Sequence, residues 1–374
     1  MTERQNGNLS PVPGRCTGSL CALNKPCETL FTRLHHPNGE SKLAKRKPEV
    51  VVVTGASAGV GRAVVREFAK RKASIGLIAR DEQRLETTKR EVEASGGKAL
   101  ALSVDVADAG QVEAAAQTVV NSFGLPDIWV NNAMTTVFAP IIDIRPEEYK
   151  RATEVTYLGT VYGTMAALKR MLPENRGAIV NVGSALAYRS IPLQAPYCGA
   201  KHAIVGFTDS LRCELIHMRS KVHVTMVHLP AMNTPQFSWC KTRLPRHPQP
   251  VPPIFEPEVA ARAIYWAAHH HRREVFVGGP TVEAIWGQKL VPGFADWYLG
   301  THGYDSQQTE QHVSPDRPAN LFHPVPGDYA AHGIFTGEAK PRSLQNWLNL
   351  HRAPASAAAA ATLGLAAFLW TRNV

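Results

Sequence analysis

The chain alternates between short apolar runs and segments whose apolar positions repeat with helical spacing. Residues 50–53 are four consecutive valines, a pattern typical of a strand buried on both faces. Over residues 62–72 apolar side chains recur one turn apart, which predicts a helix, and residues 74–79 form a second apolar run. This succession predicts a strand, a helix and a parallel strand joined as one βαβ unit.

The same alternation continues along most of the chain and predicts one open sheet. Helical patterns separate the apolar runs, so each strand can return parallel to the one before it. We therefore expect an α/β fold, a Rossmann-type doubly wound parallel sheet of about seven strands with helices on both faces. Further strands are predicted at residues 99–104, 128–130, 178–182, 222–228 and 275–277, and further helices at 112–123, 157–171 and 200–218.

A glycine-rich segment joins the first predicted strand to the first helix, where residues 54–61 read Thr-Gly-Ala-Ser-Ala-Gly-Val-Gly. Gly55 allows a tight turn, while Gly59 and Gly61 allow a ligand and the helix to approach the strand closely. Backbone amides at the start of a helix can hold a pyrophosphate. A glycine triplet alone also fits an ordinary tight turn, but its place within a βαβ unit predicts dinucleotide binding.

Tyr197 and Lys201 are four residues apart, so in a helix the phenol and the ammonium lie one turn apart on one face. A free tyrosine has a pKa of about 10, and both a neighbouring ammonium and an oxidised nicotinamide ring favour its phenolate. Ser184, upstream of Tyr197, adds a hydroxyl that can orient a carbonyl. Alone, the pair fits a solvated helix face and Ser184 fits a strand end. Together they predict hydride transfer, with Tyr197 as the acid and base.

These motifs resemble those of the short-chain dehydrogenase/reductase family, and the resemblance covers residues 48–279. It implies that Ser184 hydrogen-bonds the substrate oxygen, that Tyr197 exchanges the proton, and that Lys201 lowers the pKa of Tyr197 while holding the nicotinamide ribose. It also implies a metal-free, NADP-dependent oxidoreductase acting on a carbonyl or a secondary alcohol. The cofactor-binding positions that it implies are Gly55, Ser57, Gly59, Val60, Gly61, Arg80, Asp105, Val106, Asn132, Tyr197, Lys201, Pro230 and Thr234.

Three positions depart from the family's pattern. Met134 ends the motif Asn131-Asn132-Ala133-Met134 in place of a glycine, and Ala231 replaces a glycine beside Thr234, which we expect to bond the nicotinamide carboxamide. Thr156 stands where the family carries an asparagine that helps hold a water in a proton relay reaching the lysine. A threonine hydroxyl also donates and accepts, so Thr156 is a candidate for the fourth catalytic position. A catalytically weak, nucleotide-sensing scaffold that binds NADP(H) is the alternative function.

The end of the second predicted strand bears on the choice of nicotinamide cofactor. Arg80 stands there, and a guanidinium matches the geometry of a 2′-phosphate, which favours NADP. Asp81 follows and could instead bond the ribose diol of NAD, and Arg80 also fits a surface charge at a helix start. Asp105 and Val106 occupy the family's adenine-contacting position, where Asp105 could equally cap the next helix.

The segment between residues 235 and 257 is dense in proline and is expected to form the substrate lid without regular structure. Its aromatic residues could close an apolar pocket, although an ordinary packed loop fits as well. Leu186, Ile191 and Leu193, between the serine and the tyrosine, add to the expectation of an apolar substrate.

The 374 residues exceed what one sheet domain of this kind needs, so both ends are read as extensions. We expect residues 1–47 to be a disordered basic leader and 48–280 to be the dinucleotide-binding domain. Residues 281–352 should pack on that domain. The alanine-rich tail 353–374 is a candidate membrane anchor, with contact through residues 354–370, although its length is marginal and a helix packed on protein fits too.

Net charge and cysteine content limit the kinds of binding partner and the cellular compartment that we expect. A formal charge of +10 is partly explained by the leader and a phosphate-bearing cofactor, and no nucleic-acid-binding signature accompanies it. The six cysteines have no paired spacing for zinc or redox chemistry, which favours a reducing compartment. We expect a cytoplasmic homo-oligomer, or one held at a membrane by the tail, that uses NADP, or NAD as the alternative, on a small molecule.

Overall fold

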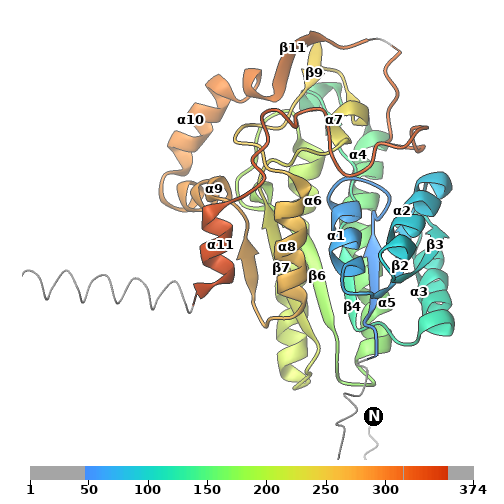
Figure 1. The fold of residues 1–374 in the computed structure, drawn as a ribbon. Coiled ribbons are helices and arrows are strands. Elements are labelled where there is room, and N and C mark those ends of the chain that lie inside the picture. The colour runs from blue at the N-terminus through green and yellow to red at the C-terminus, as the bar shows by residue number, and fades with distance from the viewer. Residues whose placement is uncertain (1–46, 315, 353–374) are drawn as a thin grey trace, which may run out of the picture. The chain divides into compact units, whose positions relative to one another are not determined.

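A seven-stranded, fully parallel sheet forms the centre of the protein in a computed structural model, which describes residues 47–314 and 316–352 (Figure 1). Its strand order is β10-β7-β6-β4-β1-β2-β3, which confirms the predicted doubly wound α/β fold. The strands are β1 (Val50–Thr54), β2 (Ser74–Ala79), β3 (Lys98–Ser103), β4 (Ile128–Asn131), β6 (Ala178–Ser184), β7 (His223–Leu229) and β10 (Glu274–Phe276).

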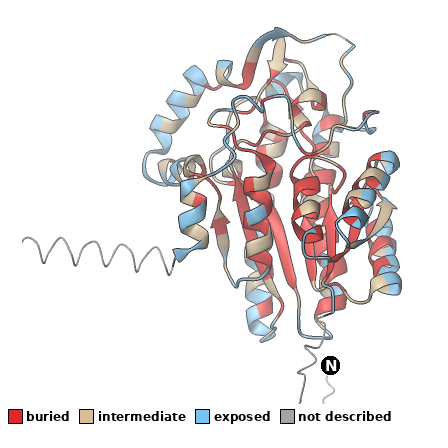
Figure 2. Cartoon of the chain, in the orientation of Figure 1, coloured by how far each residue is buried: buried red, intermediate tan, exposed pale blue. Residues whose placement is uncertain are grey.

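Helices cover both faces of this sheet, and an apolar core lies under each helical layer (Figure 2). On one face α1 (Gly59–Ala69), α2 (Glu82–Ala94) and α8 (Pro257–Ala268) bury their apolar sides. On the other face lie α3 (Ala109–Phe123), α5 (Gly159–Met171) and α6 (Ala195–His217). Strands β1, β4 and β6 are buried throughout, as their continuous apolar runs predict.

The strand order reverses between β1 and β4, and this reversal places the candidate site. From β1 the chain continues to β2 and β3 on one side, and then crosses to β4 and β6 on the other. Val53 of β1 lies opposite Val130 of β4, so the turns that follow these strands start side by side. Ligands of such sheets bind beyond the carboxyl ends of the strands at this reversal.

Several predicted helix boundaries differ from the observed ones: α1 and α3 each begin three residues earlier than predicted, at Gly59 and Ala109. The helix predicted at residues 200–218 begins earlier, at Ala195, because Pro196 is well tolerated in a first turn. The helix predicted at 157–171 is preceded by α4 (Pro146–Thr153) and a π-helical turn over Glu154–Leu158, so α5 starts at Gly159.

The expectation that residues 235–257 lack regular structure is wrong in part. The segment forms the short helix α7 (Gln236–Trp239) and the short strands β8 (Lys241–Thr242) and β9 (Arg246–Pro248). Strand β8 pairs with β5 (Val137–Phe138), and β9 pairs with β11 (Gln308–His312). Pro248 lies at the end of β9, opposite Gln308, and the other prolines of the segment lie outside these strands.

After β10 the chain forms α9 (Gly279–Leu290), α10 (Pro292–His302), β11, an irregular segment and α11 (Leu344–Leu350). The contacts Gln345 Nε2–Phe276 O and Asn349 Nδ2–Phe276 O, 3.1 and 3.3 Å long, hold α11 on β10. In the ranges 47–314 and 316–352, no helix has the length and apolar character that a membrane crossing requires. The leader predicted at residues 1–47, apart from Lys47, and the tail predicted at 353–374 lie outside the described residues, and the predicted division at residue 280 stays a prediction.

Candidate functional site

The glycine loop is folded tightly between β1 and α1, and its glycines are required by close contacts. Gly55 has φ +68°, and a Cβ there would lie 2.9 Å from the Cα of Ala133. A Cβ on Gly61 would come within 2.0 Å of the Gly55 carbonyl oxygen. Asn132 donates its side-chain amide to Thr54 O at 3.1 Å, so the motif after β4 supports the loop. Only glycine fits both positions.

Ser184, Tyr197 and Lys201 come together at the same end of the sheet. Ser184 is the last residue of β6, and Tyr197 and Lys201 lie in the first two turns of α6. The Lys201 ammonium lies 5.5 Å from the centroid of the Tyr197 ring and donates to Val182 O at 2.6 Å. These three residues and the glycine loop line one cleft of about 450 Å³, within the usual range for a small-molecule site.

Burial changes the proton affinities of this pair. It raises the pKa of Tyr197 well above its ordinary value because the desolvated site disfavours a phenolate, although a hydrogen bond with Ser184 opposes this effect. Burial also lowers the pKa of Lys201 to about 7, because the ammonium is desolvated. Near neutrality the cleft therefore holds a neutral phenol beside an amine that is close to its titration midpoint.

His228 packs against the end of β6 that carries Ser184 without lining the cleft, and no motif in the sequence pointed to it. The ring is fully buried, and its Nδ1 lies 3.2 Å from the Ser184 carbonyl oxygen. A Cβ on Gly183 would lie 2.5 Å from that nitrogen, so the glycine makes room for the ring. Burial lowers the pKa of His228 to about 4, which keeps the imidazole neutral near pH 7. The ring therefore supports the end of β6, from which Ser184 projects.

Arg80 lies at the end of the cleft expected to hold the adenosine, where its guanidinium bonds backbone carbonyls of a distant segment. Its guanidinium donates to the carbonyl oxygens of Asn320, Leu321 and Phe322, with the contact to Phe322 at 2.8 Å. Burial, and then the charge of Arg151, lower the pKa of Arg80. The sequence did not anticipate these carbonyl partners, because they lie some 240 residues further along the chain.

The two acidic residues considered for this end have structural partners. Asp81 caps α2 by accepting from Arg84 N at 2.8 Å and also pairs with the Arg84 guanidinium. Asp105 lines the cleft, pairs with Arg151 and accepts from Ala107 N at 3.1 Å. The predicted capping role of Asp105 is wrong, because α3 begins later and is capped by Asp108.

Thr156 lies in the π-helical turn and is fully buried. Its hydroxyl donates to Thr135 O at 2.9 Å and accepts from Thr135 N at 3.1 Å. The hydroxyl proton and one of its two lone pairs are therefore engaged by the backbone of the segment that follows Met134. The side chain is not among the residues that line the cleft, whereas its neighbour Val155 is.

Most of the other predicted site residues line the cleft, and Gly61 does not. Gly61 lies behind the loop against Gly55 and does not line the cleft, and Met134 and Ala231 line it with their replacement side chains. From the proline-rich segment, Phe237 and Trp239 reach the cleft. The remaining predicted cofactor positions that line the cleft are Gly55, Ser57, Gly59, Val60, Val106, Asn132, Pro230 and Thr234.

The shape of the cleft suits a dinucleotide. It runs from Arg80 and Asp105, past the glycine loop, to Ser184 and Tyr197. Gly55 and Gly59 of the loop line the cleft, and α1 begins at Gly59, so the start of this helix lies at the cleft, where a pyrophosphate can be held.

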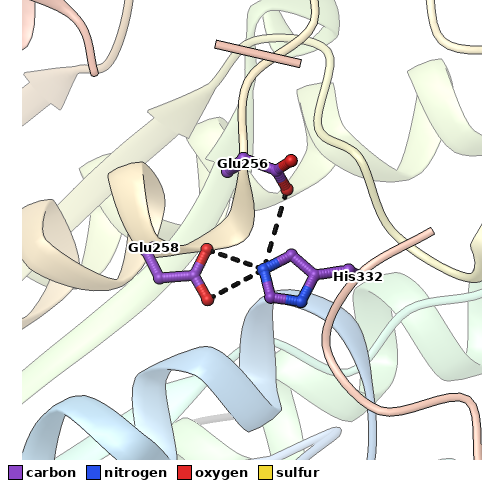
Figure 3. A group of neighbouring side chains, drawn as sticks. All are labelled: Glu256, Glu258 and His332. Atoms are coloured by element: carbon purple, nitrogen blue, oxygen red, sulfur yellow. Dashed lines mark hydrogen bonds and ion pairs between the residues drawn. The ribbon is translucent and has the colours of Figure 1, made fainter. Parts of the chain in front are cut away.

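One group of side chains among the described residues has metal-ligand chemistry and spacing: Glu256, Glu258 and His332 (Figure 3). His332 Nε2 lies 3.0 Å from Glu258 and 3.7 Å from Glu256. Glu256 also accepts from the Asn233 amide at 3.1 Å. None of the three lines the cleft, and ion pairs and hydrogen bonds account for the group.

Comparisons with known proteins agree with this geometry. A short chain dehydrogenase family model matches residues 49–241. The uncharacterized oxidoreductase YxnA of Bacillus subtilis is 33% identical over 283 residues, which cover 75% of this chain and 80% of that protein. The crystal structure of a variant of actinorhodin polyketide ketoreductase with NADPH is 27% identical at a TM-score of 0.56, covering 63% of this chain and 97% of that one. A short chain dehydrogenase from Mycobacterium paratuberculosis bound to NAD is 24% identical at a TM-score of 0.53, covering 61% and 96%.

Proposed function

Because the chain belongs to the short-chain dehydrogenase/reductase family of oxidoreductases, we propose that it transfers hydride between NADP and a carbonyl or secondary alcohol of an apolar molecule. One observation carries the proposal: a single cleft connects the glycine loop to Ser184, Tyr197 and Lys201. Cofactor binding and proton transfer would therefore occur in the same cavity.

The bound nicotinamide supplies or accepts the hydride, and the three side chains handle the substrate oxygen and its proton. Ser184 would donate a hydrogen bond to that oxygen and fix its position. Tyr197 would give the proton in reduction and take it in oxidation. Lys201 lies 5.5 Å from the Tyr197 ring, where its protonated form would favour the phenolate.

Thr156 has a different role in this proposal from the family's asparagine. Its hydroxyl is bonded in both directions to Thr135, which follows the cleft residue Met134. We therefore assign Thr156 as a positioning residue for this wall of the cleft, because its hydroxyl proton is donated to the Thr135 carbonyl and not toward a relay.

The preference for NADP rests on charge at the adenosine end. Arg80, Asp81 and Arg84 all line the cleft there, but Asp81 is paired with Arg84 and caps α2. A carboxylate committed in this way is less available to a ribose diol, whereas guanidinium groups favour a phosphate. NADP(H) should therefore bind more tightly than NAD(H).

The apolar character of the substrate rests on the other end of the cleft. Leu186, Ile191 and Phe237 line it beside the catalytic serine and tyrosine, and Leu299 of α10 lies further along. Apolar side chains stabilise a bound hydrocarbon substrate and keep water from the reacting carbon.

Screening the oxidation of NADPH and NADH by the full chain against ketones, aldehydes, steroids and quinones tests the proposal. We expect turnover of an apolar carbonyl with NADPH preferred, and its loss in Ser184→Ala. A chain that binds NADPH but turns over none of these classes in either direction would instead support the nucleotide-sensing scaffold.

We also propose membrane contact through residues 354–370, which are mostly apolar and carry no charge in sequence. Helix α10 buries none of its residues, and Phe294 and Trp297 on it are 61% and 60% exposed. Exposed aromatic side chains of this kind suit a membrane interface. Flotation of the full chain with phospholipid vesicles, but not of a chain ending at Arg352, is expected, and equal behaviour contradicts it. Homo-oligomer formation stays a prediction, which sedimentation of the full chain tests.

A further inference from the structure

Residues 317–335, which we call the C-terminal strap, follow the cofactor cleft along its length. They lie beyond the segment matched by the family model, which ends at residue 241. Figure 1 shows this part of the chain, coloured orange to red after β11, crossing above α1 on its way to α11. It contacts the adenosine end, the glycine loop and the segment after β7 in turn.

At the adenosine end, arginine side chains hold the strap by its backbone. Arg80 donates to three consecutive carbonyls at residues 320–322, and Arg84 donates to Val325 O. Arg151, which pairs with Asp105, donates to Leu321 O at 3.2 Å. Asn320 and Pro324 of the strap line the cleft itself. The strap is therefore one wall of the region in which Arg80 would meet a 2′-phosphate.

At the middle of the strap, an ion pair and a backbone bond tie it to the glycine loop and α1. Asp328 pairs with Arg62, whose guanidinium is almost fully buried and also bonds Glu91. Ala330 accepts from Gly59 N at 3.1 Å. Ala330 adopts φ +51°, a conformation that costs a residue with a Cβ about 1 kcal/mol, so the surrounding contacts must hold it.

At the nicotinamide end, the strap packs closely on residues 233 and 234. Asn233 accepts from Phe335 N at 3.1 Å through its side chain, and its carbonyl accepts from Gly333 N at 3.2 Å. A Cβ on Gly333 would lie 2.5 Å from Thr234 O, so the two backbones touch. His332 contacts Glu256 and Glu258, which connects the strap to the start of α8 (Figure 3).

We propose that the C-terminal strap is the retaining wall of the dinucleotide site, and that the cofactor exchanges only when the strap lifts. This inference rests on the proposed function, because it needs a dinucleotide in the cleft. The strap touches every part of the site except the substrate end, so weakening it anywhere should speed release. Arg80 would link the strap to the cofactor, because it bonds the strap carbonyls and also lines the cleft where the phosphate would lie.

Gly333 in the strap and Gly337 just after it provide a matched test. Gly333→Ala puts a methyl group 2.5 Å from a backbone oxygen and must displace the strap. Gly337→Ala, just beyond the strap, adds the same methyl group where no atom lies within 4 Å. Asp328→Asn weakens the strap at a different point and keeps Arg62 paired with Glu91.

The measurement is the dissociation rate of NADPH from the full chain. Stopped-flow records the fluorescence of NADPH as an excess of non-fluorescent oxidised NADP displaces it. We expect about tenfold faster release from Gly333→Ala and from Asp328→Asn, and a rate within about twofold of the parent for Gly337→Ala. Parent-like rates in both of the first two variants overturn the strap proposal while leaving the proposed function intact. Failure of the parent chain to bind NADPH or NADH overturns the proposed function itself.

Discussion

Replacing Lys201 by methionine tests whether the active-site amine is desolvated as the structure requires. Lys201 is 3% exposed, and burial lowers its pKa from 10.5 to about 7. Between these two values the unfolded chain binds a proton that the folded chain does not. Stability should therefore rise with pH across this window, by about 1.4 kcal/mol for each pH unit. Below pH 7 both states are protonated, and this contribution is constant.

The assay is urea unfolding of the parent and of Lys201→Met at pH 7 and pH 9, without nucleotide. Because half of the folded molecules are already deprotonated at pH 7, the change to pH 9 should raise the stability of the parent relative to the variant by about 2 kcal/mol. Lys70→Met is the control, because the Lys70 side chain is 64% exposed and its removal should change stability equally at both pH values. A parent-to-variant difference that is the same at pH 7 and pH 9 would show that Lys201 stays charged in the folded protein, and would refute the reasoning.

Three further substitutions probe the cofactor end and the cleft wall. Arg80→Ala should raise the KM for NADPH about tenfold more than the KM for NADH, because only the former carries a 2′-phosphate; equal increases would remove Arg80 from phosphate recognition. Thr156→Val leaves the Thr135 amide without its partner, so it should cost about 1–3 kcal/mol in unfolding experiments while turnover stays within a few-fold. A hundredfold loss of turnover at unchanged stability would return Thr156 to the proton relay. Gly61→Ala forces a Cβ against Gly55 O and should abolish NADPH binding measured by calorimetry; parent-like affinity would contradict the tight-loop geometry.

The sequence predicted the sheet well because its signals are local. The valine run of β1 and the apolar runs of β4 and β6 are buried on both faces, so their composition alone marks them as strands. The glycine loop and the spacing from Tyr197 to Lys201 are also local, and the helix that places these two side chains on one face is present.

What the sequence did not reveal depends on contacts between distant residues. Arg80 and Arg84 meet carbonyls some 240 residues away, and no pattern around them predicts this. Every residue has a backbone carbonyl, so the sequence does not show which carbonyls accept these bonds. It therefore predicted the strap only as part of an extension that packs on the domain. His228 likewise sits within an apolar strand, and only the structure places its ring beside Ser184.

Tyr197→Phe tests the central claim most directly, because it removes one oxygen from the cleft and leaves the ring that packs beside Lys201. NADPH affinity and carbonyl reduction should be measured on the parent and the variant in parallel. We predict NADPH affinity within about twofold and a loss of turnover of at least about a hundredfold. Turnover by the variant equal to that of the parent would contradict the assignment of Tyr197 as the proton donor.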